Sequence, residues 1–178
     1  MPQQEGFSQD PVHQAVVQIT VVDAVLPVDT AADWETTGPG TNKVAMAAAN
    51  VTEYLNTAGY ISLDDTNDEI DLRPGVYQVQ LELVVKNSHA SIDADFGVAV
   101  TNPAGTTVYH LSEDEYQLVA DSGVRGQVIS QTFLLNIPGS AGDATVPVIV
   151  QIAARTASAT LELVASSQIT IRRFGNND

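Results

Sequence analysis

The feature that most constrains this chain is the alternating stretch Glu69–Lys86, which reads EIDLRPGVYQVQLELVVK. A period of two places alternate residues on opposite faces of a β-strand, and a strand with one apolar face belongs to a sheet with one buried side. The turn signal Arg73-Pro74-Gly75 predicts where the strand begins. The apolar set is Tyr77, Val79, Leu81, Leu83 and Val85, and the polar set includes Gln78, Gln80, Glu82 and Lys86. The pattern predicts a scaffold strand rather than a chemical motif.

Similar segments along the chain predict an all-β domain. His13–Leu26 is rich in β-branched residues, with valine on both parities, which indicates an inner strand or one held by a neighbouring subunit. Phe96–Thr101 and Thr106–Leu111 flank an Asn-Pro-Ala-Gly turn and predict an antiparallel hairpin. Short strands with regular turn signals favour a sandwich or barrel of about eight strands. Further strands are expected at Gly59–Leu63, Gln127–Ile137, Val148–Ala154, Ala159–Ala165 and Gln168–Phe174.

Two segments fit this pattern less well. In Val44–Leu55, apolar residues recur at helical spacing within an alanine run, so helix and strand both stay open. Pro27–Gly40 is expected to be a loop. It holds the one tryptophan, Trp34, between acidic residues, where it either closes the edge of a core or anchors an interface.

A length of 178 residues suits one domain. We expect a flexible arm over residues 1–12, a single β-sandwich domain over 13–175 and a tail over 176–178. The absence of cysteine excludes disulfides and thiolate zinc sites. The first residues have no basic and apolar leader pattern, so no signal peptide is expected, and no apolar run approaches the roughly 20 residues of a membrane span.

The charge balance is strongly acidic, with 22 acidic against 7 basic residues and a formal net charge of −15. Self-repulsion at this level weakens a compact state in dilute buffer and is screened by salt. Two lysines and an excess of aspartate resemble proteins of halophilic organisms, whereas the simpler interpretation is an ordinary acidic surface. Binding to nucleic acid is disfavoured, because it requires clustered cations and the chain has one basic pair, Arg172-Arg173.

Candidate chemistry is sparse. The acidic segment Asp64, Asp65, Asn67 and Asp68 offers hard oxygen ligands for calcium, but lacks EF-hand spacing, and a solvated turn between two strands is the alternative. The three histidines lie in separate segments, and no nucleophile elbow or phosphate-binding glycine loop occurs. No catalytic residue and no cofactor other than this calcium is predicted. Asn50-Val51-Thr52 matches the glycosylation acceptor pattern, which matters only if the protein meets a glycosylation machinery.

Two parts of the chain resemble a known family. Ile70-Asp71-Leu72 with Gly75-Val76-Tyr77-Gln78-Val79 resembles a strand of the jelly rolls of tumour necrosis factor and the complement globular head. Ala159–Leu163 and Ser167–Gly175 resemble the last two strands of that fold. The resemblance covers Tyr60–Gly175 and implies a jelly-roll-like antiparallel β-sandwich.

Proteins of this fold typically assemble as trimers and act by binding. The resemblance, with the N-terminal arm and no visible leader, implies a homotrimeric virion structural protein, such as a capsid decoration, turret or spike protein. Its partners would be other virion proteins such as the major capsid protein, and it would assemble in the host cytoplasm. The alternative is a receptor- or carbohydrate-binding module of a viral fibre or cell-surface appendage, with Tyr109, Tyr116 or Trp34 at a rim. Candidate interface residues are Val17, Ile19, Val21, Trp34, Gln78 and Gln80.

Overall fold

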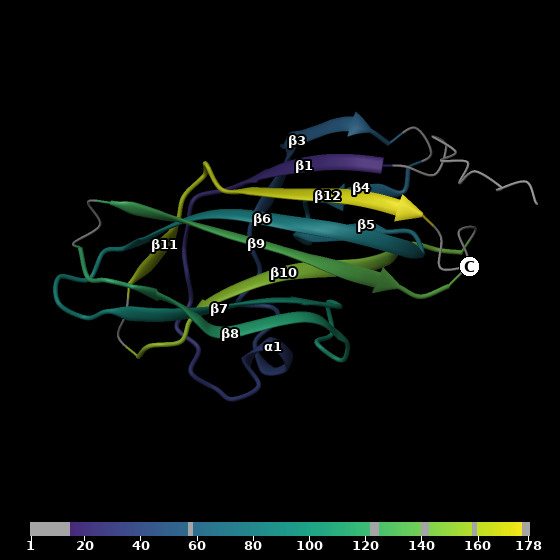
Figure 1. Ribbon diagram of the computed structural model, residues 1–178. Coiled ribbons are helices and arrows are strands. Elements are labelled where there is room, and N and C mark those ends of the chain that lie inside the picture. Colours follow the sequence, from purple (N-terminus) through teal and green to yellow (C-terminus); the bar gives the residue numbers. More distant parts are fainter. Residues whose placement is uncertain (1–14, 57–58, 122–124, 140–142, 158–159, 176–178) are drawn as a thin grey trace, which may run out of the picture.

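A computed structural model describes residues 15–56, 59–121, 125–139, 143–157 and 160–175. These residues form twelve strands and one short helix, and the strands make two antiparallel sheets that face each other (Figure 1). The predicted all-β, jelly-roll-like antiparallel sandwich is confirmed, with twelve strands in the described residues where about eight were expected. The predicted arm (1–12) and tail (176–178) lie outside the described residues. No helix within the described ranges is both long and apolar enough to cross a membrane.

The first sheet has the strand order β2-β11-β6-β12-β1-β3, and β9 pairs with the other edge of β6. β6 and β9 pair over almost their whole length, from Gly75 opposite Ile137 to Lys86 opposite Gly126. The strands of this sheet are β1 (Ala15–Val21), β2 (Ala24–Val25), β3 (Met46–Leu55), β6 (Gly75–Asn87), β9 (Gly126–Ile137), β11 (Leu161–Leu163) and β12 (Gln168–Gly175).

The second sheet has the order β4-β5-β10-β7-β8. Its strands are β4 (Ile61–Asp64), β5 (Glu69–Leu72), β7 (Ala94–Thr101), β8 (Val108–Leu118) and β10 (Val146–Ala154). The hairpin predicted on either side of the Asn-Pro-Ala-Gly turn is present as β7 and β8, with Val100 opposite His110. The register confirms the antiparallel pairing expected from the turn signal.

β6 lies at the centre of the core. The alternating side chains from Tyr77 to Val85 are at most 2% exposed, and they belong to one apolar cluster with inward side chains of the second sheet such as Phe96 and Ile152. Burying one such aliphatic side chain contributes about 1.5–3 kcal/mol. The face of Glu69–Lys86 that the sequence predicts to be buried is therefore the face that holds the two sheets together.

Two ambiguous segments are strands. β1 is an inner strand, because it pairs with both β12 and β3 of the same chain, so its apolar residues on both parities require no neighbouring subunit. Val44–Leu55 contains β3 rather than a helix, since β1 offers it a strand edge and the inward Met46 joins the core. Tertiary pairing overrides the helix preference of the alanine run.

The segment between β2 and β3 crosses the outer side of the second sheet (Figure 1) and contains α1 (Trp34–Thr37), where the sequence predicted a loop. Trp34 is fully buried against Ala99 and Ala153. A Cβ on Gly97 would lie 3.1 Å from the Trp34 Cζ2 atom, so glycine leaves the space that the indole occupies. The outer side of the second sheet is thus partly covered by the chain itself.

Candidate assembly surface

The first sheet exposes its side opposite the core, and we call this side the outer face. The register aligns its residues in rows across four strands; Thr132, Gln80, Thr170 and Gln18 form one such row. The outer face consists of Val128, Ser130, Thr132, Leu134 and Asn136 of β9, Val76, Gln78, Gln80, Glu82, Val84 and Lys86 of β6, Gln168, Thr170, Arg172 and Phe174 of β12, and Val16, Gln18 and Thr20 of β1.

The outer face is almost uncharged on a very acidic molecule. On the four strands just listed, Glu82 is the one carboxylate, against 22 acidic residues in the chain, and Lys86 and Arg172 are the cations. Glu162 of the neighbouring β11 pairs with Lys86 on the same side of the sheet. Neutral glutamine, threonine, serine and valine occupy most other positions. The negative potential of the molecule therefore arises elsewhere, and this face is where another acidic body meets the least repulsion.

Three large exposed apolar side chains lie at one end of this face, while the smaller Val128, 68% exposed, lies towards the other. Leu134 is 64% exposed and Phe174 is 53% exposed, and Tyr54 of the adjacent β3 is 65% exposed. The register places them near one row across the sheet, because Leu134 and Arg172 both pair with Gln78, and Val16 pairs with both Arg172 and Leu55. β9, β12 and β3 all run towards that end of the sheet (Figure 1). We call Tyr54, Leu134 and Phe174 the apolar end. Exposed apolar groups collected on one side of a sheet are typical of interaction sites.

Hydrogen bonds between side chains hold the polar part of the outer face in place. The Gln18 Nε2 atom donates to Gln168 Oε1 at 2.7 Å, and the Tyr54 hydroxyl donates to Gln18 Oε1 at 3.1 Å. On β6 the Gln80 Nε2 atom donates to Glu82 Oε1 at 2.8 Å. These bonds restrict long side chains before any partner arrives, which lowers the entropy lost on binding.

The structure separates the predicted interface residues into two groups. Val17, Ile19 and Val21 point into the core and are at most 2% exposed, and Trp34 is fully buried within the chain. Their side chains therefore have no free surface to offer a partner, and in Trp34 the core-closing alternative is the one observed.

Gln78 and Gln80 lie on the outer face, half-buried by their neighbours. Their contact with another subunit stays a prediction. Sequence reasoning missed the apolar end. Three consecutive apolar residues, Phe133 to Leu135, were the available signal, because a strand with one wet face cannot bury all three.

The aromatic residues expected at a carbohydrate-binding rim pack against other parts of the chain. Tyr116 stacks on Phe96, with ring centroids 5.2 Å apart, and Tyr109 packs against the main core. Burial raises the pKa of the Tyr109 hydroxyl above its usual value. Trp34 is fully buried, and Tyr109 and Tyr116 are only partly exposed.

The acidic segment after β4 is a tight turn. The Asp64 carboxylate accepts hydrogen bonds from the backbone N–H groups of Thr66 and Asn67, and Asp68 Oδ1 accepts one from the Met46 N–H at 2.8 Å. Asn67 Nδ2 also donates to Asp64 Oδ2 at 2.8 Å, and this bond is the main reason that the pKa of Asp64 is lowered. Among the described residues, no group of three or more histidine or acidic side chains is placed to hold a metal ion. The arrangement fits the solvated-turn alternative, and we do not propose calcium here.

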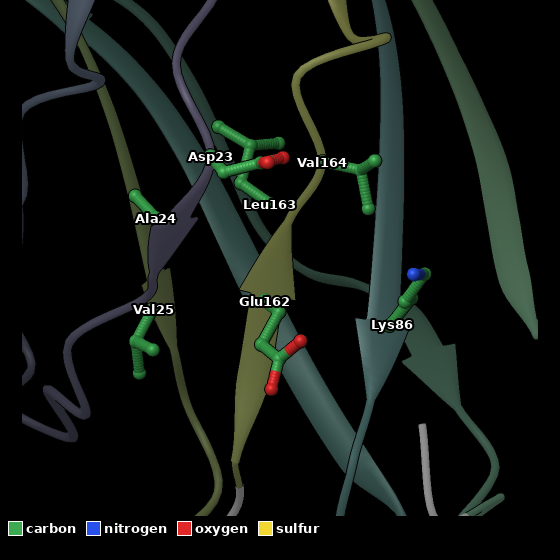
Figure 2. A pocket seen from close by; sticks show the side chains of 7 residues that line it. All are labelled: Asp23, Ala24, Val25, Lys86, Glu162, Leu163 and Val164. Atoms are coloured by element: carbon green, nitrogen blue, oxygen red, sulfur yellow. The ribbon is translucent and has the colours of Figure 1, made fainter. Parts of the chain in front are cut away.

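A shallow hollow of about 310 Å³ lies where β2, β11 and β6 meet (Figure 2). Lys86 and Glu162 stand on neighbouring strands along its wall, while Val25 and Leu163 supply apolar surface. The Asp23 carboxylate is already used, because it accepts a hydrogen bond from the Ala165 N–H. The residues that line the hollow include no nucleophile paired with a general base, so it is a surface depression rather than a reaction site.

Raised pKa values occur away from this hollow. Burial, followed by repulsion from Asp64, raises the pKa of Asp71 on β5. Burial also raises the pKa of Tyr77 to about 12, and its hydroxyl donates to the Arg73 carbonyl at 2.5 Å. The guanidinium of the buried Arg173 lies 3.9 Å from the centre of the Tyr60 ring beside it. Tyr77 and Arg173 thus fix the start of β6 to the end of β12, which is a structural role.

No protein-family model and no curated protein matches this chain. The fold is similar to that of several solved structures. Eiger TNF from S. frugiperda matches with a TM-score of 0.48 and 13% identity over 93% of this chain and 95% of its own. PRD1 vertex protein P5 matches with a TM-score of 0.44 and 13% identity, over 93% and 98%. Murine APRIL at pH 8.0 matches with a TM-score of 0.45 and 9% identity, over 90% and 98%. These similarities concern the fold.

Proposed function

We propose that this chain is a non-enzymatic structural protein of a virus particle, a homotrimeric capsid decoration, turret or spike module whose subunits associate through the outer face. The observation that carries the self-association is the outer face, which has few charged residues and an apolar end, on a molecule of net charge −15. The virion setting comes from the jelly-roll resemblance of the sequence. The source, on this proposal, is a virus of a halophilic host.

Electrostatics favours a second copy of this chain as the occupant of the outer face. Two copies repel each other wherever carboxylates meet, and this repulsion extends over about 8 Å at physiological ionic strength. In each copy, the outer face carries Glu82, Lys86 and Arg172, and Glu162 of β11 lies beside Lys86 at its rim. Approach through this face therefore adds little repulsion, whereas a basic partner would bind the acidic remainder of the surface more strongly.

The dimensions of the outer face suit a specific contact. Four strands spaced about 4.8 Å apart and about ten residues long cover roughly 20 Å by 35 Å, or about 700 Å². Standard interfaces bury about 800 Å² on each partner. The face is thus large enough for a stable contact between copies without help from the second sheet.

The apolar end supplies the driving force. Tyr54, Leu134 and Phe174 each expose more than half of their surface in the single chain. Burial of such side chains contributes about 1.5–3 kcal/mol each, less the cost of bringing subunits together. The glutamine and threonine rows then add hydrogen bonds that set the register between copies.

The test is a mass measurement in solution on the wild type and two matched variants. We expect the wild type to have three times the chain mass of 18.8 kDa by light scattering. Leu134→Asp on the outer face is expected to give monomers, because it buries a charge at the contact. Leu111→Asp makes the same exchange at an exposed position of the second sheet and is expected to stay trimeric. A monomeric wild type, or equal masses for the two variants, would contradict the proposal.

The virion role needs its own test. We expect the purified trimer to bind particles that lack it, and a chain without residues 1–14 to form trimers yet bind them poorly if the arm contacts the major capsid protein. This truncation stops before β1, which is part of the sheet. Trimers that bind no particle would leave self-association intact and refute the decoration role.

A further inference from the structure

We propose that Asn50 is an acceptor for an N-linked glycan. The chain has a single Asn-X-Ser/Thr pattern with a non-proline middle residue, and this is Asn50-Val51-Thr52. Such triplets arise often by chance, so the case depends on where the fold places this one. The proposal does not rest on the trimer, because it is read out as the mass of a single chain. The triplet nevertheless lies beside the outer face, since Thr52 pairs with Gln18.

The triplet lies on a free edge of the first sheet. β3 is the last strand in the order, it pairs with β1 on one side, and no described strand of that sheet pairs with its other side. Thr52 is exposed and Asn50 is half-exposed. An enzyme can therefore approach the triplet from the side of the sheet without displacing a paired strand.

The backbone at Asn50 departs from regular pairing. Ile19 pairs with Val51 and Val21 pairs with Met46, so one residue of β1 is opposed by the four residues from Ala47 to Asn50 on β3. A bulge of this kind leaves residues outside the hydrogen-bond ladder. Asn50 lies at the end of the bulge. Its backbone can therefore change conformation in the active site of a transferase without breaking regular strand pairing.

The Asn50 side chain is not used by the fold. Within the described residues no hydrogen bond to the Asn50 amide is present, whereas other asparagine amides hold turns and loops through hydrogen bonds. Those engaged asparagines are Asn42, Asn56, Asn67, Asn87 and Asn102. Modification of the Asn50 amide would therefore break no hydrogen bond that holds the fold.

The reaction balances with one co-reactant, a lipid-linked sugar phosphate. The Asn50 Nδ2 atom bonds to C1 of the sugar, the bond between C1 and the phosphate oxygen breaks, and the lipid phosphate leaves with the electron pair. The amide proton passes to a carboxylate of the transferase. The Thr52 hydroxyl, two residues on, is the recognition group that the triplet provides. A hydrated glycan at this position would also block strand addition to the β3 edge, which is an aggregation hazard in exposed sheets.

The test presents the folded full-length chain to a purified oligosaccharyltransferase with its lipid-linked donor and reads the intact mass. We expect one glycan per chain in the wild type and in Thr52→Ser, and none in Asn50→Gln or Thr52→Ala. A synthetic peptide spanning residues 44–56 reports that the enzyme is active. Modification of the peptide but not of the folded wild type would overturn the proposal, because the fold would then hide the triplet. An unmodified Asn50 in protein purified from its natural source would overturn it as well.

Discussion

The His110 imidazole lies flat against the Phe133 ring, with centroids 3.7 Å apart and planes 2° from parallel. His110 belongs to β8 of the second sheet and Phe133 to β9 of the first, so the stack closes the seam where the edges of the two sheets meet. Beside it, Gln131 Nε2 donates to the Ser112 hydroxyl at 2.7 Å. The sandwich is joined here by side chains rather than by backbone pairing.

The seam predicts a graded loss of stability on truncation. Phe133→Ala removes the stack and part of the core contact, and we expect it to lower the free energy of unfolding by about 2 kcal/mol. Phe96→Ala, at a fully buried ring of β7, is expected to cost more, about 3–5 kcal/mol. Urea denaturation followed by circular dichroism gives both values. Equal losses would show that the seam is as tightly packed as the core.

Charge on the outer face is expected to control association. Gln80→Glu keeps the size of the side chain and places a second carboxylate beside Glu82, so the copies repel at the contact. We expect the association constant to fall at least about tenfold in low salt, which is about 1.4 kcal/mol. Gln117→Glu adds the same charge on β8, away from the face, and serves as the control. Sedimentation equilibrium measures both, and identical association constants would contradict the assignment of this face.

Salt is expected to stabilise the chain. A formal net charge of −15 makes the folded state repel itself, and screening shortens the range of this repulsion from about 10 Å at 0.1 M to about 3 Å at 1 M. We expect the melting temperature to rise by about 5–10 °C over this range of sodium chloride, which corresponds to about 2–3 kcal/mol. Chloride is preferred to sulfate, because sulfate strengthens apolar burial in any protein. A constant melting temperature would refute the halophilic interpretation of the composition.

Asp64 and Asp71 predict opposite responses to pH. The pKa of Asp64 is lowered, mainly by its hydrogen bond from Asn67, so its ionised form stabilises the fold above the ordinary range of aspartate and loses this effect in acid. The pKa of Asp71 is raised, mainly by burial, so its ionisation costs stability as pH rises through that pKa.

The corresponding asparagine variants test these signs. At pH 7 we expect Asp64→Asn to lower the urea midpoint and Asp71→Asn to raise it, and both differences to shrink as the pH falls below about 3.9. Each variant is the control for the other, since both replace one carboxylate in the same hairpin. Shifts of the same sign in both would show that net charge dominates the local contacts.

The parity of Glu69–Lys86 was sufficient to predict the core face of β6, and turn signals were sufficient to predict the β7–β8 hairpin. Period two leaves few other solutions when the apolar residues are β-branched or aliphatic. The same logic failed for β3, where helical spacing and an alanine run suggested two structures. The segment forms a strand because β1 offers it an edge to pair with, and β1 is distant from β3 in the sequence.

The candidate surface was predictable only in part. Gln78 and Gln80 were expected on a face towards a neighbour, and they lie on the outer face. The exposed positions of Tyr54, Leu134 and Phe174 were not predicted. Alternation along a strand shows that its two faces differ, but it does not show which face a second layer covers. Trp34 illustrates the reverse case, since a chain segment from before β3 folds over Ala99 and Ala153 and buries it.

The sequence by itself determined the class of fold, the alternation of each long strand and the acidic surface, since these follow from local periodicity and composition. Only the tertiary structure decided which apolar residues stay exposed, which sheet side is covered by α1 and its flanking segment, and where the single acceptor asparagine lies. These outcomes depend on contacts between strands far apart in the chain. The local conformational preference of a residue is worth about 1 kcal/mol or less, whereas burying a whole apolar side chain is worth more. Tertiary packing therefore decides these outcomes.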